Sequence, residues 1–373
     1  MSEPSYIHLT SQELAEHDAF PVPTPHGGER GNTLYADVAA LLDGTIPEPP
    51  EPTILYRSDG HGIFYEGQVN VLFGDPESGK TMVAEAAAAA TMLAGKRVLF
   101  LDLDHNGLQS TVVRFMDMGV PEEILRDLDR FRYVEPEDRL HLLAVIEDAK
   151  RERWPHLAIV DSLGELLPLM GLNSNSPDDF TMAHGLVLKP LAMTGAGVIG
   201  IDHLPKNQEN KINGPTGTAA KRRAIGGVAI RVVVKEQFTP GKGGSAYLTL
   251  NKDRHGGLRR WCPTEGREPV VGLFTLESRP GELICMIHAP EAGDASKAEG
   301  VSDEDLAELD LLDPPPTSVR DVKERLRWRS DRAANALRHW RSRVPTPLGG
   351  EQGNTPSSVP QAFPGNGERE GER

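Results

Sequence analysis

A short segment of this 373-residue chain has the composition and spacing of a phosphate-binding loop. Residues 74–81 fit the pattern G-x-x-x-x-G-K-[ST], in which backbone N–H groups and the positive end of the following helix surround a β-phosphate. The ammonium group of Lys80 would reach the β- and γ-phosphates, and the hydroxyl of Thr81 would bind Mg²⁺. We therefore expect ATP and Mg²⁺ as ligands, contacted by Gly74, Asp75, Pro76, Glu77, Ser78, Gly79, Lys80 and Thr81.

The residues on both sides of this loop have the patterns of a strand and a helix. Residues 68–73 form a short apolar run, and residues 82–94 are rich in alanine, which has a strong helix propensity. The order strand, loop, helix is the context in which the pattern is informative. It argues against a glycine-rich turn that carries Lys-Thr by coincidence.

A second candidate ligand for Mg²⁺ follows another apolar run. Residues 157–160 are apolar and are followed by Asp161, which would hold the metal directly or through water. A buried strand that ends in Asp is common in α/β proteins, so the phosphate-binding loop upstream is what favours the metal role. The next residue is Ser162 rather than Glu, and the acid that orients an attacking water must therefore come from elsewhere.

The run of residues 97–103 contains Asp102 and is followed by Asp104. Because side chains alternate along a strand with a period of two, both carboxylates would lie on the same side, near the carboxyl edge of a sheet. They could lie beside a γ-phosphate, or they could be two acids in a solvated corner between a strand and a loop.

With these features in this order, residues 53–290 resemble the RecA-like ATPases, and among them the RepA- and DnaB-type hexameric helicases and related phage and plasmid ATPases. The resemblance implies that Asp104 activates or positions the attacking water, although Glu, one methylene longer, is usual there. It also implies that His203, after the apolar run 197–201, and Lys206 sense the γ-phosphate. The alternative for His203 is a residue that only caps a strand.

The same resemblance implies contacts with DNA and with a neighbouring subunit. The segment 204–224 would face DNA, where flexible cations suit a phosphate backbone that is bound by charge; an ordinary basic loop is the alternative. Its basic residues are Lys206, Lys211, Lys221, Arg222 and Arg223.

Lys252 and Arg254 match the Lys-x-Arg of DnaB-type helicases, which reaches the γ-phosphate of the adjacent subunit. The alternative for this pair is a salt-bridged hairpin.

Strand-like and helical runs alternate from residue 53 to about residue 288. The further strand candidates are residues 97–103, 157–160, 198–201, 228–234 and 246–250. The alternation predicts an α/β fold with a mostly parallel central sheet flanked by helices, and with ligands at the carboxyl ends of the strands. The later candidates are closely spaced and predict an antiparallel edge.

The rest of the chain divides by composition. We expect an N-terminal arm and linker at 1–52 with a short helix at 34–42, the RecA-like domain at 53–290, an acidic, Pro-rich solvated linker at 291–316, a basic module at 317–344, and a disordered tail at 345–373.

The basic module resembles a helix-turn-helix. One helix would be lined by Val319, Val322 and Leu326, and a second, capped at Ser330, by Ala333, Leu337 and Trp340. Arg332, Asn335, Arg338 and His339 would then be exposed and could contact duplex DNA. So short a segment cannot bury much core alone, and a helix pair that docks on the acidic linker or on a partner is the alternative.

Composition limits the function classes. The net charge of −15 excludes a protein that coats nucleic acid with its whole surface. Cys262 and Cys285 form no disulfide or zinc pattern, and neither a leader nor a membrane-spanning run is present, so we expect a cytoplasmic protein.

The overall prediction is an ATPase that forms a homo-oligomeric ring, with a hexamer favoured, and acts on single-stranded DNA as a replicative helicase or related motor. A recombinase filament and an ATP-gated replication initiator remain alternatives.

Overall fold

The computed structural model describes residues 38–44, 48–174, 176–204 and 219–343. The chain divides into two units, residues 1–48 and 49–373. The described part of the first unit contains helix α2 (Val38–Asp43), which overlaps the helix expected at 34–42. Among the described helices, none has the length and apolar composition needed to cross a lipid bilayer.

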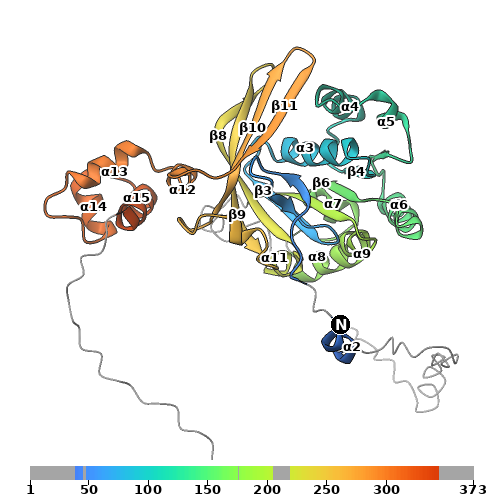
Figure 1. Ribbon diagram of the computed structural model, residues 1–373, viewed down its shortest axis with the longest axis horizontal. Helices are drawn as coiled ribbons and strands as arrows, with labels where there is room; N and C mark the ends of the chain where they lie inside the picture. The colour runs from blue at the N-terminus through green and yellow to red at the C-terminus, as the bar shows by residue number, and fades with distance from the viewer. Residues whose placement is uncertain (1–37, 45–47, 175, 205–218, 344–373) are drawn as a thin grey trace, which may run out of the picture. The chain divides into compact units, whose positions relative to one another are not determined.

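A nine-stranded sheet forms the centre of the second unit (Figure 1). Its spatial order is β11-β10-β9-β8-β3-β7-β6-β4-β5. The strands are β3 (Val69–Gly74), β4 (Val98–Asp102), β5 (Phe131–Val134), β6 (Leu157–Asp161), β7 (Gly197–His203), β8 (Val228–Thr239), β9 (Gly243–Asp253), β10 (Val270–Arg279) and β11 (Glu282–His288). Pairing is parallel from β8 to β5 and antiparallel from β8 to β11. The predicted mostly parallel sheet with an antiparallel edge is confirmed.

Helices cover both faces of this sheet because successive strand residues point in opposite directions. The helices are α3 (Lys80–Leu93), α4 (Leu108–Asp117), α5 (Glu122–Arg126), α6 (Arg139–Glu152), α7 (Leu163–Leu169), α8 (Pro177–Ala183), α9 (Lys189–Met193) and α11 (Ala219–Ala224), with a π-helical turn at His184–Leu188. On β4, Phe100 packs in the cluster that contains α3 and α4, whereas Leu99 and Leu101 pack in the cluster with α6 to α9. Alanines of α3 are buried, which brings this helix close to the sheet.

Strand order brings several candidate residues to one edge. Strand β3 lies between β8 and β7, and β6 lies between β7 and β4. The carboxyl ends of β3, β7, β6 and β4 are therefore neighbours, and each strand ends in or is followed by a predicted functional residue. A small antiparallel pair, β1 (Ile54–Tyr56) and β2 (Gly62–Phe64), precedes this region in the chain.

The C-terminal region is a small bundle. Its helices are α13 (Asp303–Asp310), α14 (Val319–Leu326) and α15 (Ser330–Arg343), and the preceding α12 (Asp294–Ala298) packs its alanines with residues of β9 and β10. Leu306 and Leu309 of α13 are buried with Val322 and Leu337 of the two predicted helices. The expectation of a solvated linker at 291–316 is therefore wrong for α13, which supplies core that the two basic helices lack. Helix α15 also begins at Ser330 itself, so Ser330 is not its preceding cap residue.

Candidate functional site

The phosphate-binding loop connects β3 to α3 in the middle of the sheet. Gly74 is confined, because a Cβ there would lie 2.6 Å from the carbonyl oxygen of Val232 and 2.8 Å from the hydroxyl of Ser78. Gly79 has a φ of 91°, in the left-handed region that favours glycine, directly before α3 begins at Lys80. The backbone path of the loop therefore requires both glycines of the pattern.

Lys80 is only 5% exposed, and its side chain folds over the loop. Its Nζ donates to the carbonyl oxygens of Asp75 at 2.7 Å and Gly74 at 3.3 Å. Burial lowers the pKa of Lys80, and nearby carboxylates, led by Asp161, oppose that shift. The cation therefore lies within the loop, where a bound phosphate group would require it.

The two predicted metal ligands are in contact. Thr81 Oγ1 donates to Asp161 Oδ2 at 2.9 Å, although the two residues lie on α3 and β6. Burial raises the pKa of Asp161 to about 6, and the charges of Asp104 and Asp102 add to the shift, while the Thr81 hydrogen bond opposes it. Hydroxyl and carboxylate oxygens fit Mg²⁺. In the described ranges no group of three or more His, Cys, Asp or Glu residues could hold a metal.

Asp104 lies at the end of this group of residues. Its Oδ1 accepts a hydrogen bond from Ser162 Oγ at 2.7 Å, and its Oδ2 is 3.9 Å from His203 Nε2. The nearby His203 side chain is the main cause of a lowered pKa at Asp104, with the Ser162 hydrogen bond adding to it and burial opposing it. The ends of β4, β6 and β7 thus bring together an ionised carboxylate, a hydroxyl and an imidazole.

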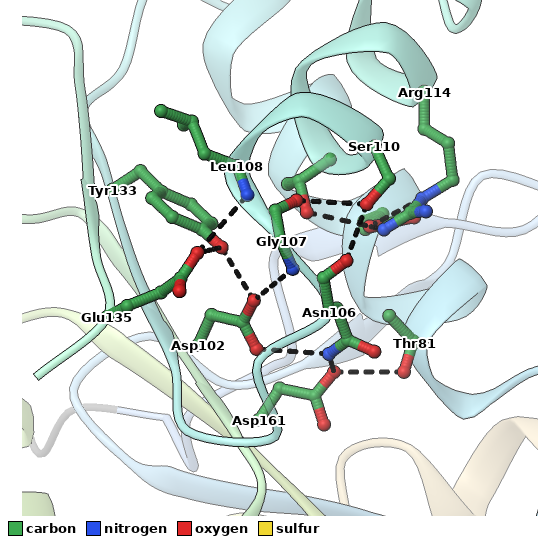
Figure 2. A network of polar contacts seen from close by, with 12 residues as sticks. Thr81, Asp102, Asn106, Gly107, Leu108, Ser110, Arg114, Tyr133, Glu135 and Asp161 are labelled. Carbon is green, nitrogen blue, oxygen red and sulfur yellow. Dashed lines mark hydrogen bonds and ion pairs between the residues drawn. The ribbon is translucent and has the colours of Figure 1, made fainter.

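Asp102 has a different environment from Asp104. It is fully buried, and Figure 2 shows it in a polar network at the start of α4. Asp102 Oδ2 accepts from the backbone N–H of Gly107 at 3.0 Å and from the hydroxyl of Tyr133 at 2.6 Å. Asn106 Nδ2 donates to Asp102 Oδ1 at 3.1 Å. The expectation that both acids would lie beside a γ-phosphate is therefore not met by Asp102, which anchors the following helix.

A buried ion pair behind the metal ligands was not predicted. Glu85 of α3 is fully buried, and Arg114 of α4 donates to both of its carboxylate oxygens at 2.6–2.9 Å. Burial raises the pKa of Glu85 to about 7, and Arg114 opposes this shift. The one available signal was an acid inside an otherwise apolar, alanine-rich helix. Neither Asn106 nor Tyr133 carried a sequence signal: Asn106 lies two residues after Asp104, and Tyr133 lies in the short edge strand β5.

The predicted DNA contact at Lys221 is not supported by its location. Lys221 is 6% exposed, its Nζ lies 2.9 Å from Asp202 Oδ2, and it lies over the ring of Phe180 at 5.5 Å. The correction follows from burial, because a cation held by a buried carboxylate is not available to a phosphate backbone. Arg222 and Arg223 of the same helix are exposed. Lys206 and Lys211 lie outside the described residues.

The two residues predicted to act across a subunit interface differ in their surroundings. Lys252 Nζ donates to the carbonyl oxygens of Arg222 at 2.6 Å and Ile225 at 2.7 Å, so it binds the C-terminal end of α11 in its own chain. Burial lowers the pKa of Lys252, and the charges of Arg254 and Arg222 add to that effect. Arg254 is exposed beyond the end of β9. A salt-bridged hairpin does not describe Lys252, whose ammonium contacts carbonyl groups.

Polar residues of α15 face the acidic helices rather than solvent alone. Arg332 pairs with Asp305 and lies 4.0 Å from the Trp328 ring. Asn335 donates to the carbonyl oxygen of Glu299, Arg338 pairs with the Glu299 carboxylate, and His339 is 4% exposed. The expected exposure is wrong for His339, which is buried, and Asn335 is partly buried, whereas Arg332 and Arg338 remain exposed beside their acidic partners. The arrangement matches the alternative of a basic helix that docks on the acidic segment.

Comparison with known proteins gives partial similarities. No family model matches this chain. A RecA protein of Mycoplasma pneumoniae is 26% identical over 129 residues, which are 35% of this chain and 36% of that protein. A RecA protein of Synechocystis is 24% identical over 135 residues, 36% of each protein. The chain therefore spans about a third of the length of these curated relatives.

Among solved structures, a KaiC-like protein of Pyrococcus horikoshii is 15% identical, with a TM-score of 0.42 over 65% of this chain and 98% of that one. The RecA similarity, together with the phosphate-binding loop and the sheet, supports a RecA-like P-loop core. These relatives are RecA proteins and a KaiC-like protein, and none of them is named as a RepA- or DnaB-type helicase.

Proposed function

We propose that this protein is a Mg²⁺-dependent ATPase with a RecA-like core, and that ATP hydrolysis is coupled to DNA, as in a replicative helicase or related motor. The observation that carries the ATPase proposal is the convergence of Lys80, Thr81, Asp161 and Asp104 at one edge of the parallel sheet. These are the groups that phosphate binding, metal binding and water orientation require.

In this proposal the loop and Lys80 bind and orient the β- and γ-phosphates. Neutralisation of phosphate charge is the chemistry that Mg²⁺ supplies when it is bound through Thr81 and Asp161. Asp104 has a lowered pKa and is a weak proton acceptor at neutral pH. It therefore acts mainly by orienting the attacking water, while His203 Nε2 lies 3.9 Å from the other oxygen of the carboxylate.

Coupling to DNA and to a second subunit rests on exposed cations. Arg222 and Arg223 extend from α11, and Arg254 extends beyond β9. Local basic residues on a chain of charge −15 suit a localised contact with single-stranded DNA. Arg254 in trans would stabilise transition-state charge on the γ-phosphate of a neighbour in a ring, for which a hexamer is favoured.

The test is steady-state ATP hydrolysis by the wild type and by Lys80→Ala and Asp104→Ala, with and without single-stranded DNA. The proposal expects a rate that depends on Lys80 and Asp104 and rises with DNA. Both variants should remain folded, as judged by circular dichroism. Equal rates in the wild type and Lys80→Ala would reject the ATPase proposal.

A second candidate is an ATP-gated DNA-binding switch, such as a replication initiator. The lowered pKa of Asp104 and its short side chain favour slow hydrolysis, which suits a switch. Tight, Lys80-dependent ATP binding without turnover, together with DNA affinity that changes with ATP, would favour this candidate over the motor. Open helical particles in electron micrographs would instead favour a recombinase filament over a closed ring.

A further inference from the structure

The side-chain amide of Asn106 connects two carboxylates that belong to neighbouring strands. Its Nδ2 donates to Asp102 Oδ1 at 3.1 Å and to Asp161 Oδ2 at 3.2 Å (Figure 2). Asp161 Oδ2 is the same oxygen that accepts from Thr81 Oγ1 at 2.9 Å. Asn106 therefore contacts the carboxylate assigned to the metal, on the side that faces α4.

An amide is well suited to this position. Asp102 and Asp161 are register partners on the parallel strands β4 and β6, and both are almost fully buried. Like charges at such close positions repel one another. One NH₂ group carries two protons and can donate one to each carboxylate, whereas a carboxylate at position 106 could only accept.

The loop that carries Asn106 also carries Asp104. The carbonyl oxygen of Asp161 accepts from the backbone N–H groups of Leu103 at 2.5 Å and Asp104 at 3.0 Å. Asp161 thus contacts the loop of residues 103–106 in two ways. Its carbonyl oxygen accepts from the loop backbone, and its carboxylate accepts from the Asn106 side chain. Asn106 itself is exposed, so hydrogen bonds rather than packing determine where its amide lies.

We propose that Asn106 is a positioning residue that orients the Asp161 carboxylate toward Thr81 and thereby sets the affinity of the nucleotide site for Mg²⁺. The inference rests on the proposed function, because it assumes that the loop binds a nucleotide with its metal. It differs from the role of Asp104, since Asn106 would act on metal binding before any hydrolysis. Partners of metal ligands commonly change metal affinity about 10–100-fold when they are removed.

The experiment is a Mg²⁺ titration of the wild type and Asn106→Ala in the presence of a fluorescent ADP analogue, with no hydrolysis required. Asn106→Ala should raise the apparent dissociation constant for Mg²⁺ about 10-fold or more. Binding of the analogue in EDTA should stay within about twofold of the wild type. Asn106→Gln, which retains the amide, should recover part of the Mg²⁺ affinity.

Tyr133→Phe is the matched control. It removes the hydroxyl that contacts Asp102 and Glu135 and leaves the Asn106 amide unchanged. Its Mg²⁺ affinity should be that of the wild type; a loss equal to that of Asn106→Ala would overturn the inference and assign the effect to the α4 anchor as a whole. A folded Asn106→Ala protein with wild-type Mg²⁺ affinity would also overturn it.

The proposed function fails in a different way. If the wild type and Lys80→Ala bind the analogue equally, with or without Mg²⁺, the nucleotide site is wrong and the inference fails with it. If Lys80→Ala loses binding and only the effect of Asn106 is absent, the nucleotide site stands and the role of Asn106 is rejected.

Discussion

Replacing Lys221 by Met should destabilise the fold rather than weaken DNA binding. The ammonium of Lys221 and the carboxylate of Asp202 are 2.9 Å apart, and their side chains are 7% and 1% exposed. Methionine retains most of the apolar stem but leaves Asp202 without its cation. Removal of one partner from a buried ion pair costs about 3–5 kcal/mol, mainly because the remaining charge is buried and unpaired.

The cost should depend on pH. Burial raises the pKa of Asp202 even with Lys221 present, and loss of the cation would raise it further. The variant can therefore reduce the cost by binding a proton more readily at pH 5 than at pH 8. We expect a loss of about 3 kcal/mol at pH 8 and a smaller loss at pH 5. For a chain of this size the larger loss corresponds to a melting temperature about 6 °C lower, at roughly 2 °C per kcal/mol.

The assay is thermal unfolding at both pH values, with Arg222→Met as the control. Arg222 is the exposed neighbour of Lys221, and its side chain should contribute less than about 0.5 kcal/mol. Adding Asp202→Asn to Lys221→Met should restore part of the stability, since replacing both partners costs less than removing one. A loss below about 1 kcal/mol for Lys221→Met at pH 8, with weaker binding of single-stranded DNA, would refute the reasoning and restore the DNA contact.

Three further outcomes are expected. As the pH rises from about 4.5 to 7, the wild type should lose about 1–3 kcal/mol of stability relative to Glu85→Gln. In this range the folded state keeps a proton on Glu85, whose pKa is about 7, whereas the unfolded state has already released it. Urea unfolding of both proteins across this range measures the difference. Asp104→Ala should lower the rate of ATP hydrolysis about 10²-fold, because the attacking water loses the group that orients it, and should leave ATP affinity nearly unchanged, as rapid-quench and equilibrium binding assays would show. Leu309→Ala should destabilise the C-terminal bundle by about 2–5 kcal/mol, since Leu309 is fully buried there, and limited proteolysis should then cleave α13 to α15 faster.

The parallel part of the sheet could be predicted because its strands are buried on both faces. Strands β4 and β6 are buried at every position, so each forms a continuous apolar run. Strands β10 and β11 were both missed. Most residues of β11 are only partly buried and its apolar pattern is weaker, whereas the first half of β10 is mostly buried, so exposure explains only the omission of β11. Strand β5, at the opposite edge, is short and has one buried residue. Exposure at the sheet edges removed the signal on which the prediction depended.

The acidic segment before the basic module was predicted to be a linker because the prediction counted its charges and did not consider where along a helix they lie. Asp303, Glu304 and Asp305 form the first turn of α13, where negative charge is favourable, and Ser302 and Asp305 form a reciprocal capping box. Leu306 and Leu309, three residues apart, then face the bundle core. The acids thus mark the start of a helix, and the count of charges alone indicated a linker.

The residues of the candidate site could be predicted from the sequence, but the side chains that contact them could not. Each of Lys80, Asp161 and Asp104 ends or follows an apolar run, and strand order determines which runs lie side by side. Asn106 and Arg114 act through side-chain contacts with Asp161 and Glu85, which leave no periodic pattern. Such contacts can be identified only from the three-dimensional positions of the loop after β4 and of the first turn of α4.

Neighbouring cations in one helix show why local charge does not predict a partner. Successive helical residues point about 100° apart, so Lys221 can turn inward to Asp202 while Arg222 and Arg223 point outward. Lys252 then occupies the carbonyl groups at the end of the same helix. Lys221 and Lys252 therefore both help to fix α11, and in the described part of this segment Arg222 and Arg223 are the cations that remain for a polyanion. A contact with DNA in the described part of this segment must depend on Arg222 and Arg223, whose double replacement by Ala should leave the fold intact and weaken DNA binding in a salt-dependent way.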